Sequence, residues 1–187
     1  ERSRGLGDVY KRQAKALAGL ATRTDVVDET TYWSYSAYSS QVEEAELHRT
    51  WLAGEPTVAP SPVTQAYTNF LLTSVFVDDY VVGAAAVLPC YWLYAQTGAQ
   101  ITRISDEHPY AAWLHTYHDD EFAQATAQAL AIVERAFALA APQARSRAAR
   151  AYLTACRHEM EFFDQALRVD LDDPGCDERS HTGIRPW

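Results

Sequence analysis

The chain has 187 residues, 48% of them hydrophobic and 22% charged, so we expect a globular domain rather than a disordered chain or two full domains. The formal net charge of −9 disfavours nucleic-acid and membrane partners, and no apolar run reaches the roughly 18 residues needed to span a bilayer. Three widely separated cysteines, with no signal-peptide pattern at the start, predict a reducing, cytoplasmic setting.

Residues 1–13 differ from everything that follows. Four basic and two acidic residues give this segment a charge of +2 and leave −11 for the rest of the chain. The run Asp8–Gln13 resembles a translation of the transposon end sequence used to prepare sequencing libraries, and a native basic arm is the alternative. We therefore expect a non-native segment over 1–13, a helical domain over 14–170 and a C-terminal tail over 171–187.

Long stretches without glycine or proline, rich in alanine and leucine, predict helices, and no run alternates as a strand would. The first helix is expected from about Ala14. Pro89 should kink the fourth helix just before Cys90, and Gly98 should cap its end. The sequence therefore predicts an all-α fold, with further helices over about 25–53, 61–77, 80–97, 109–117, 119–140 and 143–168.

Common catalytic motifs do not account for the chain. It has neither a Walker loop nor a G-x-S-x-G elbow. A di-iron bundle needs two Glu-x-x-His pairs, and only Glu178 and His181, in the tail, show that spacing. His158-Glu159 does not continue into a zinc-protease motif, and no Cys/His cluster has structural-zinc spacing. We therefore expect no metal and no cofactor.

One cysteine stands among aromatic residues in the fourth predicted helix. Cys90 and Tyr94 are four residues apart and so share a helical face. A kink at Pro89 would aim the thiol into a cavity, which suits a nucleophile. The alternative is a small buried hydrophobic residue.

A carboxyl group and several tyrosines complete the candidate chemistry. Glu159 shares the apolar stripe of the last helix with Phe162 and Phe163, so it should be salt-bridged, solvated in a pocket, or raised in pKa and able to donate a proton. Tyrosines that converge on one cavity would suit a flat heteroaromatic ligand, whereas scattered ones would be packing. Those on apolar helical faces are Tyr67, Tyr91, Tyr94, Tyr110, Tyr117 and Tyr152.

The order of these motifs resembles that of the TenA family, also called thiaminase II or aminopyrimidine aminohydrolase. The strings that carry the resemblance are YTNFL (67–71), AAVLPCYWLY (85–94), HPY with WLHTY (108–117), EF (121–122) and EMEFFD (159–164). The resemblance implies an all-helical, haem-oxygenase-like fold and a homotetramer. It also implies hydrolysis of 4-amino-5-aminomethyl-2-methylpyrimidine, and in many members of thiamin.

The resemblance implies a role for each candidate residue. Cys90 would be the nucleophile that adds to the pyrimidine ring, and Glu159 the acid/base that protonates a ring nitrogen. The substrate would be a small aminopyrimidine or thiamin, with neither nucleic acid nor membrane as partner. The residues that would line its pocket are Tyr67, Tyr94, Tyr117 and Phe162.

The chain departs from the family pattern at its start. The family carries a substrate-binding aspartate in a Tyr-x-x-Gln-Asp-x-x-Tyr-like string, and nothing here matches it. We therefore expect a bundle that lacks its first helix or helices and a chain that is unstable and nearly inactive as written. Phe163, where members commonly have tryptophan, should matter little.

Two alternatives to the enzyme remain on the same fold. One is a catalytically silent module that binds pyrimidines or thiamin. The other is a cofactor-free oxidase of the kind used in quinone-cofactor synthesis, whose site would be richer in histidine and arginine. The joint presence of Cys90 and Glu159 favours the enzyme.

Overall fold

The computed structural model describes residues 6–51, 60–101, 107 and 111–169. Every regular element in this part of the chain is a helix, which confirms the all-α prediction. The helices are α1 (Leu6–Ala21), α2 (Val27–Trp51), α3 (Pro62–Phe76), α4 (Tyr80–Val87), α5 (Pro89–Gln100), α6 (Ala111–Thr116), α7 (Asp120–Leu139) and α8 (Pro142–Val169).

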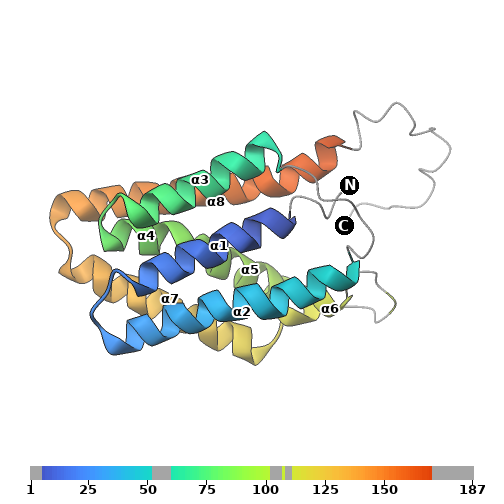
Figure 1. Ribbon diagram of the computed structural model, residues 1–187, viewed down its shortest axis with the longest axis horizontal. Coiled ribbons are helices and arrows are strands. Elements are labelled where there is room, and N and C mark those ends of the chain that lie inside the picture. The colour runs from blue at the N-terminus through green and yellow to red at the C-terminus, as the bar shows by residue number, and fades with distance from the viewer. Residues whose placement is uncertain (1–5, 52–59, 102–106, 108–110, 170–187) are drawn as a thin grey trace.

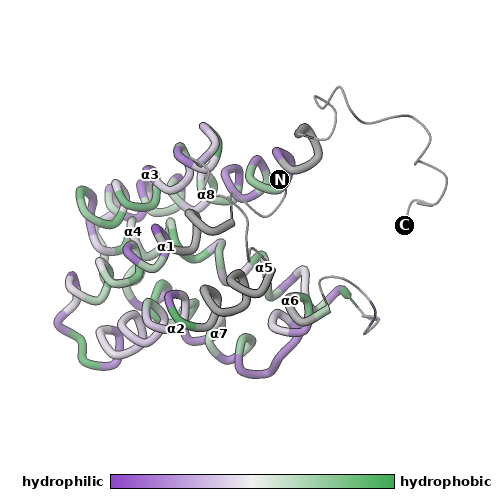
Figure 2. The backbone as a smooth tube through the Cα atoms, turned by 45° about the vertical axis from the view of Figure 1, so that its right-hand side comes forward, coloured by the Kyte–Doolittle hydropathy of each residue, from purple (hydrophilic) through white to green (hydrophobic). Residues whose placement is uncertain are grey.

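The long helices form an elongated bundle (Figure 1). Helix α1 packs against α2 and α3, and α3 also packs along α8. The short helix α4 lies inside, in contact with α1, α3, α7 and α8. Hydrophilic and hydrophobic residues alternate along most of the helices (Figure 2), as they do when a helix turns one face to a core. Within the described ranges, no helix is long and apolar enough to cross a membrane.

Helix α4 forms the centre of the core. All seven residues Val81–Val87 are buried, which suits a short helix covered on every side by other helices. Gly83 allows this packing, because a Cβ at that position would lie only 2.8 Å from the Cα of Val75 on α3. The close approach of α4 to α3 brings the next segment, with Cys90, towards Tyr67.

Helices α4 and α5 are separated at Leu88, directly before Pro89. Leu88 keeps helical angles (φ −54°, ψ −37°), but Pro89 has no N–H to donate back to Ala85. The interruption lies where the sequence predicted a kink. The prediction of a C-cap at Gly98 is wrong, because α5 continues to Gln100. A Cβ on Gly98 would collide with the carbonyl oxygen of Tyr117, so the glycine allows α5 to pack closely against the segment that follows α6.

Helix α1 begins at Leu6, earlier than the expected start at Ala14. Arg12 on this helix donates a 2.8 Å hydrogen bond to Asn69 Oδ1 on α3. The foreign origin of residues 1–13 stays a prediction, but part of that segment is helical. Several predicted features lie outside the described residues: Tyr110, the pair Glu178 and His181, and the tail over 171–187.

Candidate active site

Three helices bring Tyr67, Cys90 and Glu159 together. Tyr67 on α3 is fully buried, while Cys90 at the start of α5 is 8% exposed and Glu159 on α8 is 3% exposed. The Tyr67 hydroxyl lies 3.0 Å from Cys90 Sγ and donates a 2.6 Å hydrogen bond to Glu159 Oε1. The thiol and carboxyl that the sequence singled out therefore meet on either side of one phenol oxygen.

The single phenol proton sets the direction of these hydrogen bonds. Because the Tyr67 hydroxyl donates to Glu159, its oxygen is left to accept from the Cys90 thiol. The Glu159 carboxyl is a second acceptor within reach of the Cys90 thiol, whose single proton can go to one oxygen at a time. Directly or through Tyr67, the thiol proton has a path to the carboxyl.

Burial dominates the electrostatics of this cluster. Loss of solvent raises the pKa of the Glu159 carboxyl, while hydrogen bonds with Tyr67, Cys90 and Tyr94 oppose the rise. Burial also raises the pKa of Tyr67 well above its usual value, and the negative charges of Cys90 and Glu159 add to this. Tyr67 therefore stays protonated at neutral pH, and Glu159 holds a proton more readily than an exposed glutamate does.

The other predicted pocket residues, Tyr94, Tyr117 and Phe162, differ in how they contact this cluster. The Tyr94 hydroxyl donates a longer, 3.4 Å hydrogen bond to Glu159 Oε2, and its ring lies 4.9 Å from that of Tyr117, measured between centroids. Phe163 also packs on Tyr94, with centroids 5.7 Å apart. Phe162 is a core residue, only 6% exposed, and its ring meets the edge of Phe163. Hydrogen bonds thus join Tyr94 to the cluster, and ring contacts add Tyr117.

His158 is a neighbour of the cluster that the sequence analysis did not single out. Its ring stacks on the ring of Tyr67, with centroids 5.5 Å apart and planes 18° from parallel. In the sequence, His158 stood out only as half of an incomplete zinc motif. Its position next to Glu159 was a signal in the sequence, but the stacking depends on how α8 meets α3.

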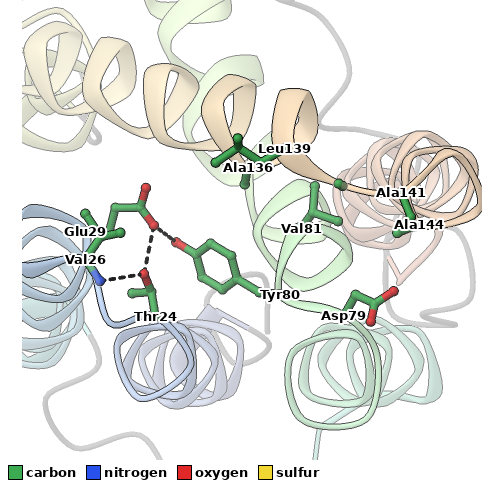
Figure 3. A pocket seen from close by; sticks show the side chains of 11 residues that line it. Thr24, Val26, Glu29, Asp79, Tyr80, Val81, Ala136, Leu139, Ala141 and Ala144 are labelled. Atoms are coloured by element: carbon green, nitrogen blue, oxygen red, sulfur yellow. Dashed lines mark hydrogen bonds between the residues drawn. The ribbon is translucent and has the colours of Figure 1, made fainter.

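A second polar cluster, around Glu29, joins the start of α2 to Tyr80 at the start of α4 (Figure 3). Glu29, 5% exposed, accepts hydrogen bonds from Thr24 (3.0 Å) and Tyr80 (2.8 Å), and Arg135 lies 3.4 Å away. Trp33 Nε1 donates to the Tyr80 hydroxyl at 2.8 Å. Since protein donors already satisfy this carboxylate, its role is to tie α2 to α4 and α7.

A cavity of about 410 Å³ adjoins Glu29 and shares no lining residue with the Cys90 cluster. This cavity was not among the predicted sites. Its lining residues are Thr24, Val26, Glu29, Asp79, Tyr80, Val81, Ala136, Leu139, Ala140, Ala141 and Ala144. Across the described part of the chain, no three His, Cys, Asp or Glu side chains are grouped so as to hold a metal ion.

An all-helical bundle and a buried thiol–phenol–carboxyl cluster thus characterise the described part of this protein. The chain belongs to the TENA/THI-4/PQQC family, whose profile matches residues 18–169. The resemblance to TenA proteins drawn from the sequence is thereby confirmed.

Two curated relatives place the chain more closely. It is 50% identical over 165 residues to the thiamine biosynthesis multifunctional protein ThiED of Corynebacterium efficiens, a match that covers 85% of the chain but 22% of that protein. The chain thus spans about a fifth of the length of that relative. It is 28% identical to the aminopyrimidine aminohydrolase of Bacillus subtilis, over 88% of the chain and 67% of the relative.

Solved structures share the architecture. The TenA homologue of Pyrococcus horikoshii superposes with a TM-score of 0.77 and 20% identity, covering 89% of this chain and 81% of that one. At this identity the match shows the fold alone. The predicted haem-oxygenase-like helical fold is confirmed.

Proposed function

We propose that this chain hydrolyses 4-amino-5-aminomethyl-2-methylpyrimidine to the hydroxymethylpyrimidine and ammonia, as a salvage step in thiamin metabolism, with thiamin as a second substrate. The observation that carries the proposal is the Tyr67 hydroxyl, which lies between the Cys90 thiol and the Glu159 carboxyl. The Bacillus subtilis relative, named aminopyrimidine aminohydrolase, supports the same reaction class. A cytoplasmic homotetramer that needs no metal or cofactor belongs to the same proposal.

The first step activates the nucleophile. A thiol is a weak nucleophile, so Cys90 must lose its proton. That proton passes to the Tyr67 oxygen while the Tyr67 proton passes to Glu159, which leaves a thiolate and a neutral carboxylic acid. The cluster carries one negative charge before and after the transfer. No additional charge is buried, and the desolvation cost of a second ion is avoided.

The thiolate then adds to a carbon of the pyrimidine ring and forms a C–S bond, while Glu159 gives its proton to a ring nitrogen. The ring is no longer aromatic, so its electrons can expel the aminomethyl nitrogen from its protonated, ammonium form. The nitrogen leaves as ammonia and an exocyclic methylene remains on the now positively charged ring. Water adds to that methylene as the hydroxyl and releases one proton, which balances the proton that left on the ammonia. The C–S bond breaks, the ring nitrogen returns its proton to Glu159, and the aromatic product is released. Covalent catalysis of this kind divides one difficult substitution into easier steps.

The aromatic residues near the cluster fit a flat substrate. Tyr94 and Tyr117 would present ring faces and hydroxyls to the pyrimidine, and Phe162 would back this wall from the core. We assign these three residues to substrate binding rather than to proton transfer.

The test is the pair Cys90→Ser and Cys156→Ser, with ammonia and the hydroxymethylpyrimidine quantified after incubation with the aminopyrimidine and, separately, thiamin. Cys156 lies on α8, only partly buried, and serves as the matched control. We expect Cys90→Ser to abolish turnover and to retain substrate binding in calorimetry, while Cys156→Ser keeps both. Turnover that survives in Cys90→Ser would make the thiol structural. Binding without turnover in the unmodified protein would favour the silent binding module.

The same assays test the expectation that the 187-residue chain, which has no match to the family's aspartate string, is impaired. Full-rate turnover by this chain would contradict that expectation without contradicting the reaction.

A further inference from the structure

His158 contacts two aromatic rings of α3. Its imidazole stacks on Tyr67, with centroids 5.5 Å apart and planes 18° from parallel. Its second contact is with Phe70: the two ring centroids are 5.2 Å apart and the ring planes are inclined at 44°. Because Tyr67 and Phe70 are three residues apart, they project from the same face of α3, and the imidazole from α8 is held by both.

Helix α8 therefore contacts Tyr67 at two different places with two consecutive residues. His158 covers the face of the phenol ring, and Glu159 accepts the hydrogen bond from its hydroxyl. We propose that His158 is a positioning residue for Tyr67, which keeps the phenol oxygen within hydrogen-bond distance of Cys90 and Glu159 at once. The catalytic consequence of this role rests on the proposed function, whereas the positioning itself rests on the ring geometry.

The two hydrogen bonds leave little tolerance for movement of the ring. The phenol oxygen must remain near 3.0 Å from Cys90 Sγ and 2.6 Å from Glu159 Oε1. The hydroxyl lies at the far end of the side chain, so a small rotation of Tyr67 breaks one contact or both. Misplacement of a reacting group by about 1 Å can cost roughly 100-fold in rate. A flat ring packed against the phenol face limits that rotation.

The face of the imidazole, rather than its nitrogens, makes this contact. Nδ1 of His158 has no hydrogen-bond partner, although Glu161 Oε2 lies 3.5 Å away. A flat ring without nitrogen should therefore replace histidine. The titratable groups of the cluster and around it are Cys156, His158 and Glu159 from α8, Cys90, Tyr91 and Tyr94 from α5, and Tyr67 from α3. The one titratable residue of α4, Tyr80, belongs to the Glu29 cluster.

The experiment follows the reaction of Cys90 with iodoacetamide from pH 6 to pH 10, with each cysteine identified by peptide mass spectrometry. The readout is the Cys90 rate at pH 7 divided by its rate at the high-pH plateau, which cancels changes in accessibility. We expect His158→Ala to lower this ratio about three- to tenfold, because the thiol loses its aligned proton acceptor. His158→Phe should keep the ratio, as should the control Leu153→Ala, which truncates a 55% exposed side chain on the same helix.

A double-mutant cycle separates positioning from general loosening of the protein. If His158 acts through the Tyr67 hydroxyl, His158→Ala should leave the ratio unchanged in a Tyr67→Phe background. The proposal is overturned if His158→Ala has no effect on the ratio in the unmodified chain, or has the same effect in both backgrounds. Should His158→Ala fail to fold, His158→Leu and His158→Phe decide: a lower ratio for leucine alone supports positioning, and equal ratios overturn it.

None of these measurements requires turnover. A ratio that responds as expected in a protein that hydrolyses neither substrate would support the positioning role and contradict the proposed function. If turnover depends on Cys90 but His158→Ala does not change the ratio, the proposed function is supported and the positioning role is overturned.

Discussion

Tyr67 donates a 2.6 Å hydrogen bond to Glu159, a residue 92 positions later in the chain, and the same phenol oxygen lies 3.0 Å from Cys90 Sγ. One hydroxyl thus connects α3, α5 and α8 inside the bundle. Because it accepts from one partner and donates to the other, it can pass a proton without gaining charge. The predictions on activity depend on this contact, whereas those on stability concern the packing around it and elsewhere in the bundle.

Tyr67→Phe should lower kcat by about 10²- to 10⁴-fold, because it keeps the ring that stacks on His158 but removes the hydroxyl that relays the proton. Steady-state kinetics with the aminopyrimidine provide the measurement. Tyr32→Phe is the matched control, since Tyr32 is also buried and donates to the carbonyl of Ala125 at 2.8 Å, away from the cluster. If both variants lose activity alike, the relay role is wrong.

The pH profile of kcat/KM should be bell-shaped. The active cluster holds one proton to share between Cys90 and Glu159, so a second proton at low pH and the loss of the shared one at high pH both inactivate it. Burial raises the pKa of Glu159, so the acid limb should lie above pH 4.5, the usual pKa of this side chain. An acid limb at or below that pH would contradict the assignment of Glu159.

Glu159→Gln should stabilise the fold at alkaline pH while it abolishes turnover. Burial raises the pKa of Glu159 in the folded state, so its ionised form is less stable there than in the unfolded chain. The free energy of unfolding therefore falls as pH rises through the folded-state pKa. Urea unfolding at pH 8 should show the variant to be more stable, by about 1.4 kcal/mol for each unit by which folding raises the pKa of Glu159. The gain should vanish below pH 4.5. Glu134→Gln, on the exposed face of α7, is the control and should show no such trend.

Tyr80→Phe should lower the free energy of unfolding by about 1–3 kcal/mol, because it leaves the Trp33 indole N–H without its acceptor and removes one of the donors to Glu29, which keeps Thr24 and Arg135. Chemical denaturation measures the loss, and kcat should be unchanged because this cluster shares no residue with the Cys90 site. Tyr35→Phe, whose side chain is 55% exposed, should be neutral. Equal stability of the two variants would remove the structural role assigned to Glu29.

Gly98→Ala should destabilise the chain, although alanine usually improves a helix by about 1 kcal/mol over glycine. The new Cβ would collide with the main chain of Tyr117, so α5 and the segment after α6 would have to separate. Thermal unfolding compared with Thr97→Ala, an exposed neighbour on α5, tests this. A higher melting temperature for Gly98→Ala would show that the close approach is dispensable.

Local features of the sequence were sufficient to predict most of the helices. The interruption at Pro89 follows from a missing N–H, and α8 follows from a run of helix-forming residues after Pro142. The pairing of Cys90 with Glu159 came from the order of motifs and not from periodicity. Gly98 was misassigned because a glycine near a helix end suggests a cap, and nothing local indicates that Tyr117 lies against it.

The sequence by itself thus determined the all-helical class, the family and the two groups that carry the candidate chemistry, since each depends on neighbouring residues or on motif order. Only the tertiary structure decided that Tyr67 is the bridge, that His158 stacks on it, and that Phe162 belongs to the core. These contacts join residues far apart in the chain, and they depend on the angles and offsets at which α3, α5 and α8 pack. Side-chain volumes across the whole core set those angles, and no local pattern encodes them.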